Sequence, residues 1–129
     1  MVTEDYVSFE TAKLLEEKGF SENTLMVYSQ NGNFMPDGAI EDTYQVFYAA
    51  PTLQMAMKWL REKGFHIFVP LEIDYDEDER GDKWYHDATY YPEIRRVSDG
   101  KIMCDDGSLY ASPEQACEAA IKYCLENLF

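Results

Sequence analysis

The sequence LLEEKGF at residues 14–20 returns almost unchanged as WLREKGF at residues 59–65. Both copies end in Lys-Gly-Phe. Glycine is typical of the position just beyond a helix, because the chain there adopts a left-handed backbone that glycine reaches without a Cβ clash. A lysine in the last turn also complements the partial negative charge of the helix C-terminus. The repeat therefore predicts two helices that end at Lys18 and Lys63.

The other shared letters, leucine and phenylalanine, fit the same interpretation. In a Schellman motif the residue after the glycine packs against the residue five positions earlier. That rule pairs Phe20 with Leu15 and Phe65 with Leu60. A duplicated binding motif is the alternative, but every shared letter already has a structural purpose. We therefore expect the repeat to fix two helix ends and the start of the segments that follow.

The starts of these two helices carry signals of their own. Ser8 is a good N-cap, and Val7 and Ala12 lie at the two positions that form a hydrophobic staple around a helix start. The second helix begins with Thr52 as its N-cap, or with Ala50 as its N-cap and Pro51 in the first helical position. Apolar residues at helical spacing follow both starts, so both segments are predicted to be helices.

A third helix is predicted at the end of the sequence. Ser112 is followed by a proline in the first helical position and by Gln115 three residues on, which is the pattern of a capping box. One apolar stripe then runs at helical spacing through Cys117, Ala120, Ile121, Cys124, Leu125 and Leu128. The stripe predicts a helix that packs this face against the core.

Strand signals fill the remaining chain. Asn31-Gly32 and Asp99-Gly100 are dipeptides that favour hairpin turns. Pro70 indicates a sheet edge or a bulge, and Pro36–Asp42 is expected to be a loop. The predicted strands are Leu25–Ser29, Thr43–Ala49, Phe65–Ile73, Lys83–Tyr91, Ile94–Val97, Lys101–Cys104 and, more briefly, Leu109–Tyr110.

This pattern predicts one α+β domain over residues 1–129. Short strands joined by turns form antiparallel sheets, and helices cover one face of such a sheet. The expected order is α-β-β-α-β-β-β-α, with three helices packed on a mostly antiparallel sheet. The length and the hydrophobic fraction of 46% are sufficient for one core.

Charge sets the expected class of partner. The chain has 25 acidic and 11 basic residues and a net charge of -14. Such a field repels phosphates and anionic lipids, so we expect neither direct nucleic-acid binding nor membrane binding. The charge serves solubility, or it forms an acidic surface that docks on a basic protein partner.

Cysteine usage and the first residues indicate a compartment. Three cysteines without a CxxC pair do not form a disulfide framework, which favours a reducing environment. The first ten residues, MVTEDYVSFE, have neither the basic start nor the apolar run of a secretory signal. No stretch approaches the length of a membrane span. We therefore expect a soluble, cytoplasmic protein.

The strongest local anomaly is the acidic run EIDYDEDERGD at residues 72–82. A solvated, mobile loop between two strands is one interpretation, and a contact surface for a basic partner is the other. Asp74, Asp76 and Asp78 are spaced like the start of an EF-hand, but Glu79 replaces the required glycine and Tyr85 the required glutamate. The candidate interaction surface is Glu72, Asp74, Asp76, Glu77, Asp78, Glu79, Asp82, Trp84 and Tyr85.

Other candidate chemistry is sparse. His66 and His86 are the only histidines, and neither has a second ligand at zinc-site spacing. Cys117 and Cys124 lie on the core stripe of the last helix. The sequence contains no phosphate loop, dinucleotide fingerprint or nucleophile elbow. We therefore predict no catalytic residue, no metal site and no cofactor.

Three segments resemble a known family. They are YVSFETAKLLEEKGF at residues 6–20, APTLQMAMKWLRE at residues 50–62 and SPEQACEAAIKYCLENLF at residues 112–129. Together they resemble uncharacterised small proteins of gut Bacteroidales bacteria and their phages and prophages. Residues 70–106 are longer and more acidic than the family pattern. The resemblance implies a cytoplasmic, phage-derived accessory protein, and it carries over no catalytic or binding residue.

The expected function is therefore that of a non-enzymatic, acidic interaction protein that binds a host or phage protein. The alternative is a small-molecule or nucleotide-binding protein, or an enzyme, whose site has no local motif. That alternative requires a deep pocket with a few convergent polar groups.

Overall fold

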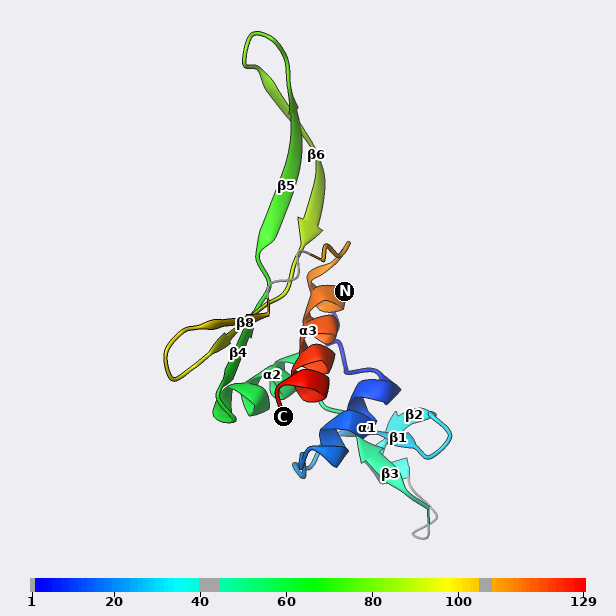
Figure 1. Cartoon of the computed structure of the whole chain (residues 1–129). Coiled ribbons are helices and arrows are strands. Elements are labelled where there is room, and N and C mark those ends of the chain that lie inside the picture. Colours follow the sequence, from blue (N-terminus) through cyan, green and yellow to red (C-terminus); the bar gives the residue numbers. More distant parts are fainter. Residues whose placement is uncertain (1, 40–44, 105–107) are drawn as a thin grey trace.

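The computed structural model of the chain describes residues 2–39, 45–104 and 108–129. Figure 1 shows a compact body of helices and short strands, from which one long β-hairpin projects. The elements in chain order are α1 Phe9–Glu17, β1 Met26–Ser29, β2 Phe34–Pro36, the 3-10 turn η1 Asp37–Ala39, β3 Phe47–Ala49, α2 Leu53–Glu62, β4 Phe65–Phe68, β5 Leu71–Glu77, β6 Lys83–Tyr90, β7 Glu93–Arg96, β8 Ile102–Cys104 and α3 Pro113–Asn127. The predicted α+β class is confirmed. The order of helices and strands agrees with the predicted order, except that the structure contains additional short strands.

All three helix starts have the predicted side-chain caps. The hydroxyl of Ser8 accepts a hydrogen bond from the amide of Thr11, and that of Ser112 accepts one from the amide of Gln115. For α2, Thr52 is the N-cap and accepts from the amide of Met55, which decides between the two predicted starts. Local sequence therefore defines where each helix begins.

The glycines of the repeated motif have the expected left-handed backbone. Gly19 has a φ of 100° and Gly64 a φ of 105°. At α1 the motif is complete, since the amide of Phe20 donates to the carbonyl of Leu15 at 2.9 Å. At α2 the amide of Gly64 donates to the carbonyl of Arg61, and the next residue already starts β4. The repeat is thus confirmed as two helix ends.

The strands divide among three antiparallel sheets. One has the order β2-β1-β3, the second has the order β4-β7-β8, and the third is the ribbon β5-β6. The two dipeptides with hairpin signals both lie at turns, where Gly32 has a φ of 88° and Gly100 a φ of 72°. Both predicted hairpins are therefore confirmed.

Some strand boundaries differ from the prediction. Phe65–Ile73 was predicted as one strand, but Pro70 separates β4 from β5, which belong to different sheets. Proline cannot donate to a ladder, so it ends the pairing here. Part of predicted strand Thr43–Ala49 lies outside the described residues, and its last three residues form β3. The short strand predicted at Leu109–Tyr110 is instead a single isolated β-bridge between Tyr110 and Tyr90.

The core lies between the helices and the two three-stranded sheets. α1 packs against β3, α2 packs against β4, and α3 contacts both other helices (Figure 1). The predicted apolar stripe of α3 is buried from Cys117 to Leu125. Helix α3 therefore connects α1 and the sheet beside it to α2 and the sheet beside that helix. The β5-β6 ribbon lies outside this core.

Candidate functional site

The β5-β6 ribbon, Leu71–Tyr90, forms a projecting arm (Figure 1). Its turn is built by Asp78, whose carboxylate accepts from the amides of Arg80 at 2.9 Å and Asp82 at 3.0 Å. Gly81 has a φ of 87° and completes the turn. The interpretation of the acidic run as a mobile loop is wrong, because its first half is strand β5. The pairing of the strands holds this half extended.

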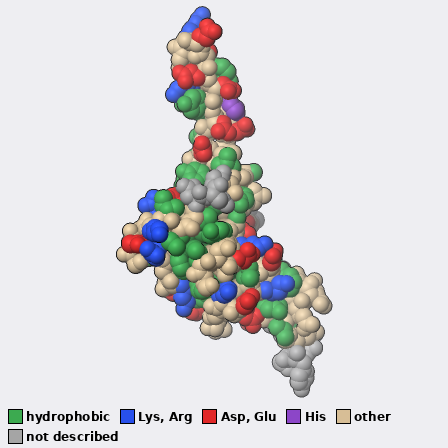
Figure 2. Space-filling model, viewed as in Figure 1, with side chains coloured by type: hydrophobic (Ala, Val, Ile, Leu, Met, Phe, Trp, Pro, Cys, Tyr) green, Lys and Arg blue, Asp and Glu red, His purple; other side chains and the backbone are tan. Residues whose placement is uncertain are grey.

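The register of the arm places its acidic side chains together. Side chains alternate across a strand, and paired residues share a face. Asp74 pairs with Asp87 and Asp76 with Trp84, so these side chains share one face. We call it the acidic face; its members are Glu72, Asp74, Asp76, Trp84, His86, Asp87 and Thr89. Figure 2 shows acidic side chains along the arm, with a histidine side chain among them.

His86 owes its position on this face to a β-bulge. Asp74 pairs with Asp87 but Tyr75 pairs with Tyr85, so His86 is the extra residue of β6. Its ring nitrogens lie 3.2 Å from an Asp76 carboxylate oxygen and 3.0 Å from an Asp87 carboxylate oxygen. The hydrogen bond to Asp87 raises the pKa of His86, and the nearby charge of Asp76 adds to it. His86 is thus a pH-sensitive bridge between the two strands.

The opposite face of the arm is apolar. The rings of Tyr75 and Tyr85 lie 5.6 Å apart, and the ammonium of Lys83 lies 4.6 Å from the Tyr75 ring centroid. Glu77 pairs with Lys83 at the end of the strands. We call this the apolar face; its members are Leu71, Ile73, Tyr75, Tyr85 and Ala88, with Glu77 and Lys83 at its outer end.

The predicted surface residues are all on the arm, but the arm divides them. Trp84 is on the acidic face and 53% exposed, whereas Trp59 in the core is 7% exposed. Glu77 and Tyr85 point to the other face. Asp78, Glu79 and Asp82 belong to the turn or its borders. The sequence prediction missed Leu71, Ile73 and Tyr75 on the apolar face, for which the alternation in LEIDYDE was the available signal. It also missed His86 and Asp87 on the acidic face, which depend on the pairing of β6 with β5.

The other candidates have structural positions. His66 is exposed on β4, at the edge of its sheet, as expected. Burial raises the pKa of the Cys117 and Cys124 thiols to about 12, so both stay protonated at neutral pH. The partial EF-hand spacing forms no loop, because Asp74 and Asp76 lie in a paired strand. No cluster of three or more His, Cys, Asp or Glu able to hold a metal occurs among the described residues.

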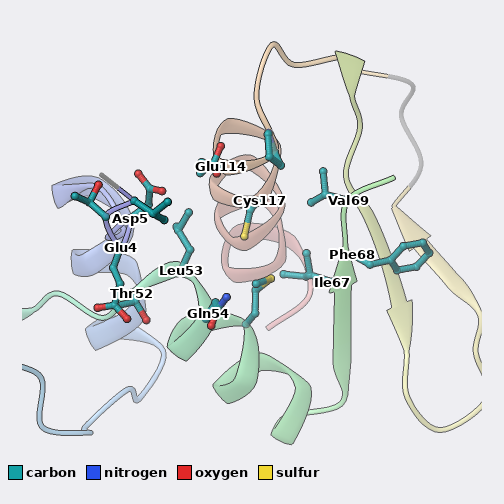
Figure 3. A pocket seen from close by; sticks show the side chains of 14 residues that line it. Glu4, Asp5, Thr52, Leu53, Gln54, Ile67, Phe68, Val69, Glu114 and Cys117 are labelled. Atoms are coloured by element: carbon teal, nitrogen blue, oxygen red, sulfur yellow. The ribbon is translucent and has the colours of Figure 1, made fainter. Parts of the chain in front are cut away.

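A cavity of about 550 Å³ lies in the body, and its lining reaches Val69, two residues before the arm begins. Figure 3 shows Leu53, Ile67 and Cys117 approaching it from α2, β4 and α3. Its polar residues include the carboxylates of Glu4, Asp5 and Glu114 beside the uncharged Thr3, Thr52 and Gln54. The cavity thus has both apolar lining residues and three carboxylates. No local motif in the sequence indicates it.

No family model, curated protein or solved structure matches the chain. Within the described ranges, no helix is both long enough and apolar enough to span a bilayer.

Proposed function

We propose that the protein is a non-enzymatic interaction protein whose arm binds a basic protein partner through the acidic face. The observation that carries this proposal is the position of four carboxylates, on Glu72, Asp74, Asp76 and Asp87, along one side of a ribbon that projects from the body. A surface of one charge sign steers an oppositely charged partner and fixes its orientation.

The arrangement of Asp74 and Asp87 supports this proposal. The two residues are directly opposite in the register, and like charges in such a pair destabilise a sheet. A bound lysine or arginine side chain removes that repulsion. The repulsion therefore destabilises the free protein and is relieved in the complex. This is expected of a surface that binds a partner, and not of a surface that stabilises the fold.

Trp84 adds an aromatic contact to the negative charge of the acidic face. It pairs with Asp76 and is largely exposed, so a cation bound by the carboxylate can also lie over the indole ring. Arginine suits this combination best, because its planar guanidinium stacks on aromatic rings and binds carboxylates with two hydrogen bonds. The partner class is thus a protein with an exposed, arginine-rich segment.

The resemblance supplies the biological context of the proposal. It implies a phage or prophage accessory factor that acts in the bacterial cytoplasm on a host or phage protein. A phage factor of this kind requires surface complementarity to its target and no chemistry of its own.

The test is partner capture from host lysate at low and high salt. The neutralised variant carries Glu72→Gln, Asp74→Asn, Asp76→Asn and Asp87→Asn; the matched control carries Glu16→Gln, Glu17→Gln, Glu22→Gln and Glu62→Gln, which are exposed and lie outside the arm. We expect the wild type and the control to retain a basic partner at low salt and to lose it as salt rises. Equal capture by both variants, or capture that is independent of salt, would refute the proposal.

The cavity supports a second candidate function, the binding of a small cationic molecule with an apolar body. Its volume is in the range of ligand sites, and its carboxylates match a positive charge. We expect hexylamine to raise the melting temperature and hexanoate to leave it unchanged, because bound ligand stabilises the folded state. Glu114→Gln with Glu4→Gln should reduce the effect of hexylamine. Equal shifts with both compounds, or none, would remove this candidate.

A further inference from the structure

The apolar face of the arm is exposed along its length. The exposed fractions are 53% for Leu71, 46% for Ile73, 47% for Tyr75 and 65% for Tyr85. These side chains are neighbours in the register, so they form one continuous patch. Patches of this kind on a soluble protein mark contact sites. A two-stranded ribbon is also only marginally stable in water unless its hydrophobic face is covered.

The acidic face and the apolar face differ in charge. The acidic face has four carboxylates and one histidine. The charged residues of the apolar face are Glu77 and Lys83, which are opposite each other in the register, so their charges sum to zero. A basic partner therefore finds no excess of negative charge on the apolar face. Its occupant must instead be apolar and free of net charge where it makes contact.

We infer that the occupant is a second copy of this chain, which packs its own apolar face against the first. A two-fold interface uses the same patch on both copies, so the patch must be complementary to itself. The apolar face meets this requirement, because it is neutral and the patch of Ile73, Tyr75 and Tyr85 on one copy would face the same patch on the other. The acidic face fails it, because two copies would repel.

The projection of the arm makes this contact possible. The arm extends well beyond the helices in Figure 1, so a second ribbon has room to approach it. Two ribbons stacked face to face form a small two-layer β-structure, with side chains from both inner faces in the layer between them. Both acidic faces then point outward. The dimer therefore presents the basic partner with two binding faces, although self-association does not depend on that partner.

Salt distinguishes the two surfaces. The chain has a net charge of -14, so two copies repel at low ionic strength. Salt screens this repulsion and leaves the apolar contact in place. Self-association should therefore strengthen as salt rises, whereas binding of the basic partner should weaken. The failure of one proposal can thus be told from the failure of the other.

The experiment is sedimentation velocity of the purified full chain over a range of protein concentrations, at low and high salt. We expect a monomer-dimer equilibrium that shifts toward the dimer with both concentration and salt. Ile73→Thr with Tyr75→Thr and Tyr85→Thr keeps good strand formers but removes apolar area, and should weaken dimerisation roughly tenfold or more.

The matched control is the variant with Glu72→Gln, Asp74→Asn, Asp76→Asn and Asp87→Asn on the acidic face. It should dimerise at least as well as the wild type at low salt, because repulsion is reduced. Thermal melting monitored by circular dichroism checks that the body of each variant is folded. A wild-type chain that stays monomeric at every concentration and salt, a dimer that dissociates as salt rises, or a triple threonine variant that dimerises as well as the wild type would overturn the inference.

Discussion

The indole of Trp59 stacks on the ring of Phe129, with centroids 5.6 Å apart and planes 3° apart. Phe20 meets the same indole edge-on at 5.5 Å, and Phe65 lies 5.9 Å from Phe129. The phenylalanines of the two repeated motifs therefore converge on one aromatic cluster. The repeat ends two helices, and it also brings the residues after both ends to the C-terminus of the chain.

The first prediction concerns this cluster. Phe129→Ala removes the stacked ring and should lower the free energy of unfolding by about 1–2 kcal/mol. Leu25→Ala, at a residue that is 83% exposed, is the control and should change the free energy by less than about 0.5 kcal/mol. Urea unfolding followed by circular dichroism measures both variants. Equal stability of the two would show that the stacking contributes little.

The second prediction concerns the helix-ending glycines. Gly19→Ala and Gly64→Ala should each destabilise the fold by about 1–2 kcal/mol, because alanine in a left-handed backbone brings its Cβ close to a carbonyl oxygen. An added Cβ meets no other atom within 4 Å at these positions, so the effect is confined to the backbone. Gly38→Ala, where no positive φ occurs, is the control. An unchanged melting temperature in Gly64→Ala would contradict this assignment.

The helices were predictable because their boundaries depend on residues a few positions apart. Ser8, Thr52 and Ser112 cap their helices through amides three residues on, and Gly64 needs only its own backbone angle. The division of the strands among three sheets was not predictable in this way. It depends on Pro70, which separates two strands that continue into different partners.

The candidate site was predictable in part for the same reason. The alternation in LEIDYDE already separates acidic from apolar side chains on β5. The matching residues of β6 depend on the bulge at His86, which shifts the pairing by one position. A bulge arises from the pairing of two strands, so the sequence of one strand does not indicate it. The cavity beside Leu53 likewise requires segments that are far apart in the chain.

The third prediction concerns the protonation of His86. Asp87→Asn removes the hydrogen-bonded carboxylate, so the pKa of His86 should fall toward its ordinary value of 6.5. The folded-state pKa is raised, so the extra stability is fully present below about pH 6.5 and is lost as pH rises through the folded value. NMR titration of the His86 ring protons in both proteins measures the change. Identical titration curves would show that the contact does not persist in solution.

The same linkage predicts a pH effect on the arm alone. The neutral imidazole no longer carries the charge that pairs with Asp76 and Asp87, so the ribbon should open more readily above the His86 pKa. Fluorescence of Trp84 in a Trp59→Phe background reports on the arm during urea unfolding. His86→Gln should remove the pH dependence of that signal.

The last prediction concerns a contact between α1 and α3. One carboxylate oxygen of Glu118 accepts hydrogen bonds from the amide of Ser8 at 2.9 Å and from the hydroxyl of Thr11 at 2.7 Å. Glu118 therefore caps the start of α1 from another helix, where its negative charge also complements the helix dipole. Glu118→Ala removes the acceptor and should cost about 1–2 kcal/mol.

Two further variants show whether Glu118 acts through this contact. In the part of the chain that the structure describes, its second carboxylate oxygen, Oε2, is buried without a hydrogen-bond partner. Glu118→Gln keeps the accepting oxygen and should therefore cost less than Glu118→Ala. Glu126→Ala removes an exposed carboxylate 3.9 Å from Lys122 and should change stability by less than about 0.5 kcal/mol. Urea unfolding of all three variants measures the differences, and an equal loss from Glu118→Ala and Glu126→Ala would leave the capping contact without a stabilising role.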